Sequence, residues 1–381
     1  MYRNTNTKEA AKEIQLGCGL LFVCFCFAYL YVLQADLLAL IQHLLSDGQT
    51  TYSPFWGALI WTVLLLLLQV GTARIGKFPI RFHALSYFPS CLVLSAITTF
   101  EVPFAETVQT GWLWWGYALA VLLFLGAGFF VKEFPDISKK RVTKSALLWP
   151  NLVLFCTLFV FVAMSSNTNK DIHDDLRTAR LLTVGMEKDA LQVGKKSSTA
   201  TRSMSAMRAY LLSKYGLLGE NLFCFPNDHG AQSLMFTATD TLWMKDVVAM
   251  AHRHWNGAPS KRLENKAALF FETLQGRDAT NTVAKDYLLS AYLLDKRLDD
   301  FALLLPKFYT VDESLPTHYK EAWLLYSKEK NTSATQLTDS LLVERYDAFM
   351  SVRSQYQERI MQANMCRKFH GNTYWWYYYF K

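Results

Sequence analysis

The first 164 residues contain few charged side chains. They hold 11 Lys and Arg and 8 Asp and Glu, whereas the other 217 residues hold 28 and 24. The net charges are therefore +3 and +4, which together make the +7 of the whole chain. Neither half has the concentrated positive charge that nucleic-acid binding needs. We expect no nucleic-acid partner.

The sequence also lacks the common catalytic motifs, since neither GxSxG nor HExxH occurs. The stretch VGKKSS offers Gly194 and Lys195, but Lys196 stands where a phosphate-binding loop requires Ser or Thr. We interpret it as a solvated loop. His252 and His254 are two residues apart, so on a helix they would not share a face as metal ligands do. We therefore predict no catalytic residue, no cofactor and no metal.

Long uncharged runs fill the first half of the chain. About 20 apolar residues suffice for a helix to cross a bilayer, and runs such as WTVLLLLLQV show no polar face. The sequence therefore predicts a transmembrane domain over residues 1–164. Its five predicted spans lie near residues 14–35, 54–72, 84–100, 107–131 and 145–164. The third span is the shortest and contains Pro89.

Basic residues alternate between the segments that flank these spans. The N-terminal tail and the second and fourth loops hold all 11 of them, and the first and third loops hold none. Because positive residues stay on the cytoplasmic side, we predict a cytoplasmic N-terminus and an extracytoplasmic domain over residues 165–381. The first uncharged run is too long for a signal peptide, so we interpret it as a permanent anchor.

The second domain shows helical periodicity and no convincing alternating strand. Ala267, Phe270, Phe271 and Leu274 follow the spacing of one helix face. The stretch AKDYLLSAYLLDKRLDDFALLLPKFY predicts two helices on a tight polar turn. The chain is therefore predicted to be all-α, with helix hairpins after the spans. No strict tetratricopeptide consensus repeats three times, so a degenerate solenoid and a plain helical domain both stay open.

Three stretches carry a resemblance to a known family: RAYLLSKYGLLGENLFCFP, the hairpin stretch above, and LPTHYKEAWLLY. Over roughly residues 208–326 they resemble an uncharacterised family of polytopic inner-membrane proteins from Bacteroidota with tetratricopeptide-like tails. The resemblance implies a bacterial inner membrane and a periplasmic second domain. It brings no catalytic residue with it.

Carboxylates at the outer ends of the spans are candidate functional residues. Asp36 follows the first span, and Glu101 and Glu106 bracket the short turn after the third. Ionisable groups within a bilayer point to function, but these lie at span ends, where water reaches them. No span has a charge at its centre, which argues against a transporter.

Cysteine is sparse outside the spans. Five of the seven cysteines lie within them, and only Cys224 and Cys366 belong to the second domain. A disulfide is chemically permitted in an extracytoplasmic domain. Sequence cannot show whether these two thiols are close enough, so a disulfide between them is one possibility.

The chain ends on seven consecutive aromatic residues. They are Tyr374, Trp375, Trp376, Tyr377, Tyr378, Tyr379 and Phe380. The segment is too short for a sixth span. We favour an extended segment that docks in a hydrophobic groove of the helical domain. A return to the membrane interface and a peptide that binds a partner are the alternatives.

These features favour a non-enzymatic role. We expect a scaffold or adaptor that is embedded in the lipid bilayer and whose periplasmic helical domain binds an envelope protein or peptide. The alternative is an integral-membrane enzyme, or a lipid- or glycan-handling protein, with its site at the outer face of the spans.

Overall fold

The computed structural model describes residues 2–99, 112–132, 144–195, 197–330 and 339–381. Within these ranges the chain forms helices and turns and no β-strand, as the all-α prediction requires. The chain divides into two compact units, Met1–Leu176 and Arg177–Lys381. The division falls within a helix, α7 (Lys170–Thr183), whereas the sequence suggested a boundary at the end of the last apolar run, after residue 164.

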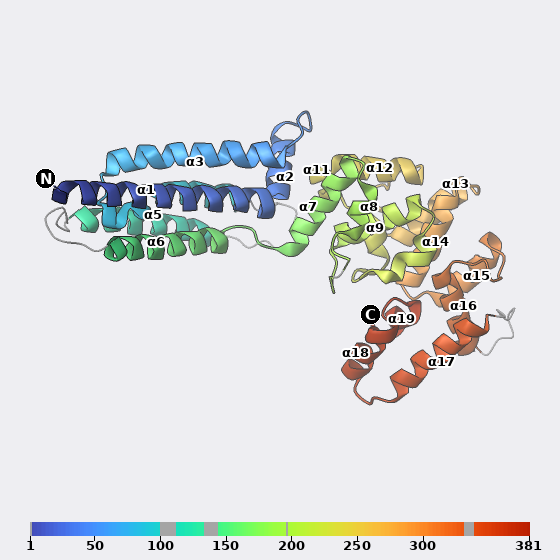
Figure 1. Cartoon of the computed structure of the whole chain (residues 1–381). Helices are drawn as coiled ribbons and strands as arrows, with labels where there is room; N and C mark the ends of the chain where they lie inside the picture. Colours follow the sequence, from blue (N-terminus) through green and yellow to red (C-terminus); the bar gives the residue numbers. More distant parts are fainter. Residues whose placement is uncertain (1, 100–111, 133–143, 196, 331–338) are drawn as a thin grey trace. The chain divides into compact units, whose positions relative to one another are not determined.

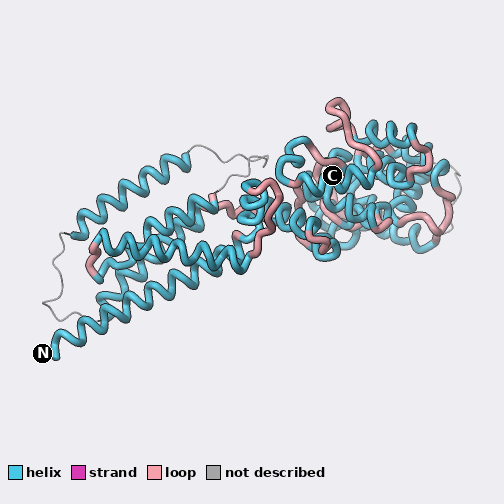
Figure 2. The backbone as a smooth tube through the Cα atoms, turned by 90° about the horizontal axis from the view of Figure 1, so that it is seen from above, coloured by secondary structure: helices cyan, strands magenta, loops and turns pink. Residues whose placement is uncertain are grey.

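The first unit is a bundle of long apolar helices (Figures 1 and 2). Its helices are α1 (Tyr2–Ala28), the π-helix η1 (Tyr29–Leu33), α2 (Ala35–Leu45), α3 (Pro54–Gly76), the 3-10 helix η2 (Ile80–Tyr87), α4 (Phe88–Thr98), α5 (Trp112–Lys132) and α6 (Lys144–Ser165). Large apolar side chains such as Leu67 and Leu122 are more than 60% exposed along these helices. Surfaces of this kind suit a lipid environment.

Four helical stretches among the described residues are long and apolar enough to cross a membrane. They are Glu9–Leu33, Pro54–Gly76, Ile80–Thr98 and Lys144–Ser165. They coincide with four of the five predicted spans. The predicted span at 107–131 begins outside the described residues, and within its described part Trp115–Val131 forms a shorter apolar helix. The count of five therefore stays a prediction.

Asn151 fixes the kinked third stretch of this bundle. The Ala84 amide donates to Asn151 Oδ1 at 2.7 Å, and Asn151 Nδ2 donates to the Ile80 carbonyl at 3.0 Å. The side chain thus supplies partners that the 3-10 turn of η2 leaves open. Beside it, the Tyr87 ring packs between Phe22 and Phe155, with centroids 4.8 and 5.0 Å away.

The second unit consists of short helices around α14. Its helices are α8 (Glu187–Gln192), α9 (Arg202–Lys214), α10 (Leu218–Asn221), η4 (Leu222–Cys224), η5 (Gly230–Leu234), α11 (Ala238–Trp243), α12 (Lys245–Trp255), α13 (Ala267–Arg277), α14 (Thr282–Leu294), α15 (Leu298–Phe308), α16 (Thr317–Lys330), α17 (Ser340–Ser354), α18 (Arg359–His370) and α19 (Tyr374–Phe380). Helix α14 is buried on all sides from Tyr287 to Leu294. The second unit therefore has its own hydrophobic core.

The helix pair predicted from the sequence is confirmed as α14 and α15. Asn281 begins α14 by accepting a hydrogen bond from the Ala284 amide at 3.0 Å. Lys296 then adopts a positive φ of 57° in the tight turn before α15. The predicted apolar face at Ala267, Phe270, Phe271 and Leu274 is likewise buried.

Candidate functional site

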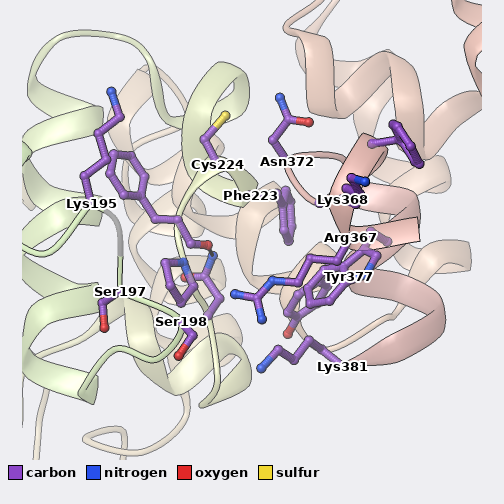
Figure 3. Close-up of a pocket in the computed structure, with 16 residues that line it drawn as sticks. Lys195, Ser197, Ser198, Phe223, Cys224, Arg367, Lys368, Asn372, Tyr377 and Lys381 are labelled. Atoms are coloured by element: carbon purple, nitrogen blue, oxygen red, sulfur yellow. Dashed lines mark hydrogen bonds between the residues drawn. The ribbon is translucent and has the colours of Figure 1, made fainter. Parts of the chain in front are cut away.

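A pocket of about 400 Å³ opens in the second unit (Figure 3). Three segments far apart in the sequence form it: the loop between α8 and α9, the stretch from η4 to residue 227, and the end of α18 with α19. Its lining residues are Lys195, Ser197, Ser198, Phe223, Cys224, Phe225, Pro226, Asn227, Arg367, Lys368, Phe369, Gly371, Asn372, Trp376, Tyr377 and Lys381. The volume lies within the range of known ligand sites.

The first wall is the loop after α8, for which the sequence predicts a solvated loop. Gly194 has a positive φ of 62°, and the Ser197 amide closes the turn onto the Gly194 carbonyl at 3.0 Å. This turn presents Lys195 and Ser198, both exposed. The loop is thus solvated, and it also borders the pocket.

The middle of the pocket is held by Asn227. Its buried side chain donates to the Leu222 carbonyl at 2.9 Å and to the Phe225 carbonyl at 3.0 Å. These bonds fold the chain back after η4. As a result Phe223 lies in the core, with its ring centroid 4.9 Å from that of Tyr377.

The second wall is formed where α18 ends and α19 begins. Gly371 sits so close to α18 that a Cβ there would lie 2.5 Å from the Arg367 carbonyl oxygen, which excludes larger residues. Thr373 then caps α19 by accepting from the Trp376 amide at 3.2 Å. The Arg367 guanidinium lies over the Trp376 ring, 5.5 Å from its centroid.

The pocket lining is positively charged. Lys195, Arg367, Lys368 and Lys381 contribute to it, and none of the described lining residues is acidic. Asp228 lies beside the lining and pairs with Lys381, which removes part of that excess. Figure 3 shows Lys195 and the two serines on one side, and Arg367 and Lys368 on the other. The arrangement suits a negatively charged ligand.

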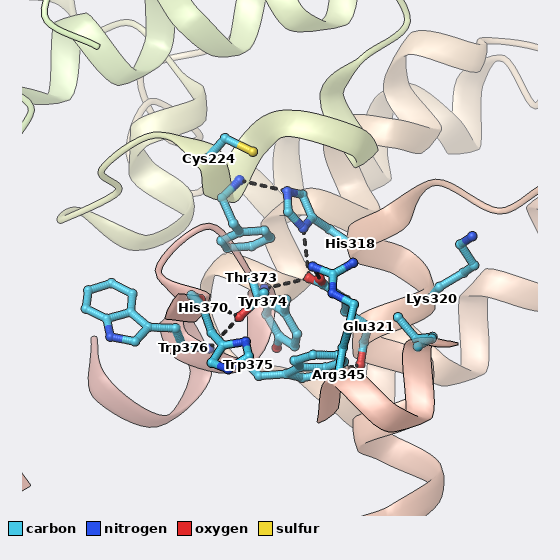
Figure 4. A network of polar contacts seen from close by, with 12 residues as sticks. Cys224, His318, Lys320, Glu321, Arg345, His370, Thr373, Tyr374, Trp375 and Trp376 are labelled. Atoms are coloured by element: carbon cyan, nitrogen blue, oxygen red, sulfur yellow. Dashed lines mark hydrogen bonds and ion pairs between the residues drawn. The ribbon is translucent and has the colours of Figure 1, made fainter. Parts of the chain in front are cut away.

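A buried polar network centred on His318 and Glu321 lies next to Phe223 and Cys224 (Figure 4). Glu321, fully buried, accepts from the Tyr374 amide at 2.7 Å and contacts His318 Nδ1 at 2.9 Å. Its backbone carbonyl accepts from Trp375 Nε1 at 2.8 Å. The two bonds from Tyr374 and Trp375 join α16 to the start of α19, so they hold the second wall of the pocket in place.

His318 is flanked by groups that favour opposite charge states. Burial by itself lowers the pKa of His318, but hydrogen bonds with the Cys224 thiol and the Glu321 carboxylate outweigh it and raise the pKa to about 9. The Phe223 amide, 3.3 Å from Nε2, instead favours a lone pair on that nitrogen. Either charge state can donate Nδ1–H to Glu321, but the negative charge of that carboxylate stabilises a positive ring and so raises the pKa of His318. We therefore expect a protonated ring at neutral pH.

The aromatic end of the chain packs inside its own unit. Tyr374, Trp375 and Tyr377 are buried, and the Trp375 ring packs against Tyr346 with centroids 5.1 Å apart. The predicted extended conformation is wrong, because the segment is the helix α19. A helix lets successive aromatic side chains face both the core and the pocket, where Trp376 and Tyr377 lie.

The structure describes only some of the other predicted site residues. Asp36 lies in the first turn of α2, while Glu101 and Glu106 lie outside the described residues. Cys224 is exposed and Cys366 buried, both as free thiols. A disulfide between them stays a prediction.

His252 and His254, the candidate metal ligands, both lie in α12 and contact other residues. His254 Nε2 lies 2.9 Å from Ser213 Oγ, and His252 packs against the Trp255 ring. In the part of the chain that the structure describes, no group of three His, Cys, Asp or Glu residues could hold a metal ion.

The charged residues of the pocket are not apparent from the sequence pattern. Arg367 and Lys368 stand in CRKFHGN, a basic turn directly before a glycine. Such a turn is equally expected at an ordinary helix end, where cations favour the helix dipole. Only the fold places it opposite Lys195.

Comparison with known proteins gives a family match for part of the chain. Residues 250–381 match a family of unknown function (DUF6057). No curated protein and no solved structure matches the chain. The matched segment contains α16, α18 and α19, so it includes the second wall of the pocket and the Glu321 network.

Proposed function

We propose that the protein is a non-enzymatic, membrane-anchored adaptor whose second unit binds a protein or peptide partner in the basic pocket. The observation that carries this proposal is the pocket itself, whose lining contains both cationic side chains and aromatic rings. Arg, Trp and Tyr are the residues that most often dominate binding energy at protein interfaces. Arg367, Trp376 and Tyr377 stand together in the lining.

The rigidity of the second wall supports a binding role. Its backbone is fixed through Glu321 and through the Trp376 Nε1 bond to the Ala363 carbonyl at 2.9 Å. A wall that is already ordered loses little conformational entropy when a ligand binds. The pocket is therefore preorganised on this side.

The first unit supplies the anchor in this proposal. Its four long apolar stretches suit a bilayer, and the alternation of basic loops favours a cytoplasmic N-terminus. The second unit would then face the periplasm of a bacterial envelope and form tetratricopeptide-like hairpins, as the sequence resemblance implies.

Site-specific photo-crosslinking in native membranes tests this function. The photoreactive residue p-benzoylphenylalanine replaces Phe369, a pocket residue that is 59% exposed. A matched control carries it at Leu303, which is 70% exposed on α15 and lies outside the lining. We expect a discrete protein adduct at residue 369 alone. Equal adducts at both positions, or none, would contradict the proposal.

A further inference from the structure

We infer that the pocket binds an acidic peptide segment, with Arg367 pairing one carboxylate and Lys195 a second one on the opposite wall. This inference rests on the proposed function and names the chemistry of the partner.

Lys195 and the cations of α18 come from opposite walls of the pocket. Lys195 belongs to the loop before α9, whereas Arg367 and Lys368 belong to the end of α18, across the pocket (Figure 3). A single compact anion such as phosphate needs donors that converge on it. Charges spaced along a chain satisfy separated cations better. The spacing therefore favours a segment with several carboxylates.

Asp228 reduces the positive charge that the pocket offers to a ligand. It pairs with Lys381 and accepts from the Ala200 amide at 3.3 Å, so Lys381 is partly neutralised. The cations that remain for a ligand are Lys195 on the first wall and Arg367 and Lys368 on the second. Arg367 is the strongest of them for a carboxylate, because its planar guanidinium can donate two parallel bonds.

The uncharged part of the lining suits a peptide. Phe225 and Phe369 offer apolar surface, and the exposed Asn372 offers an amide that can both donate to and accept from a backbone. A peptide bound between such groups is recognised through its main chain as well as its charges.

The test uses the full chain in a neutral detergent and a fluorescein-labelled hexaglutamate peptide, followed by fluorescence anisotropy. Hexaglutamine is the uncharged control peptide. We expect binding of hexaglutamate alone, with an affinity that falls as NaCl rises because salt screens the charges. We expect Arg367→Glu and Lys195→Glu each to weaken binding about tenfold or more.

Lys261→Glu is the matched control, because Lys261 is an exposed lysine of the same unit outside the pocket lining. It changes the net charge equally and should alter affinity by less than about twofold. Circular dichroism of each variant checks the fold. An equal loss in Lys261→Glu, or no binding of hexaglutamate, overturns the inference.

Inorganic phosphate serves as competitor. If it displaces the labelled peptide as effectively per mole as unlabelled hexaglutamate does, the site takes a compact anion and the inference is wrong. The two proposals fail separately. If a protein adduct forms at residue 369 but hexaglutamate does not bind, only the adaptor role is preserved. If hexaglutamate binds and Lys195→Glu weakens that binding, but no adduct forms, only the anion site is preserved.

Discussion

Replacing Trp375 by alanine should destabilise the second unit severely. The side chain is fully buried, packs on Tyr346 and Phe349, and donates to the Glu321 carbonyl at 2.8 Å. Removing a buried tryptophan costs about 3–5 kcal/mol, because packing is lost and a cavity remains. A domain of this kind has only about 5–15 kcal/mol of stability in total. Trp375→Phe, which keeps a ring, should cost less.

Hydrogen exchange of the full chain in detergent measures this loss. The buried amides of α14 should exchange through opening of the whole second unit. A loss of about 3–5 kcal/mol then speeds their exchange by two to nearly four orders of magnitude, since about 1.4 kcal/mol is a factor of ten. Leu303→Ala, at a residue 70% exposed, should change it less than threefold. An acceleration below tenfold in Trp375→Ala would refute the packing role of α19.

Three further predictions concern protons, thiols and the bundle. Since the pKa of His318 is raised to about 9, its stabilising effect is complete below pH 6.5 and is lost as the pH rises through about 9; urea unfolding across this range should show the decline. Maleimide should label Cys224 in the native protein and Cys366 only after unfolding, whereas protection of both until reduction would reveal a disulfide. Asn151→Ala leaves the Ala84 amide without its partner and should cost about 1–3 kcal/mol, seen as earlier exposure of buried thiols on heating.

The long apolar helices of the first unit could be predicted because each depends only on a continuous run of sequence. Length and lack of charge suffice to identify a run such as Pro54–Gly76. What the sequence did not show is the interior of the bundle. The 3-10 turn of η2 depends on Asn151, which lies on another helix. A contact between two helices of this kind produces no periodic pattern in the sequence, so the sequence does not predict it.

The predicted extended conformation of the aromatic end was wrong for a physical reason. Seven aromatic residues have weak helix propensity and favour extended structure when considered alone. Burial of Trp375 and the bond from the Tyr374 amide to Glu321 outweigh that preference. Thr373 at the N-cap was a readable signal for a helix. Tertiary contacts thus decided the conformation.

Part of the pocket belongs to the segment that matches the family, and the rest lies outside that match. The match over residues 250–381 includes Arg367 and Lys368 but neither Lys195 nor the stretch around Phe223 and Asn227. The matched segment alone therefore supplies only one wall and one set of cations. If two walls hold separate carboxylates, Lys195→Glu and Arg367→Glu should each reduce affinity, and their combined effect should be nearly additive, since well-separated charges couple weakly. A double variant no weaker than Arg367→Glu would show that the matched wall binds the ligand by itself.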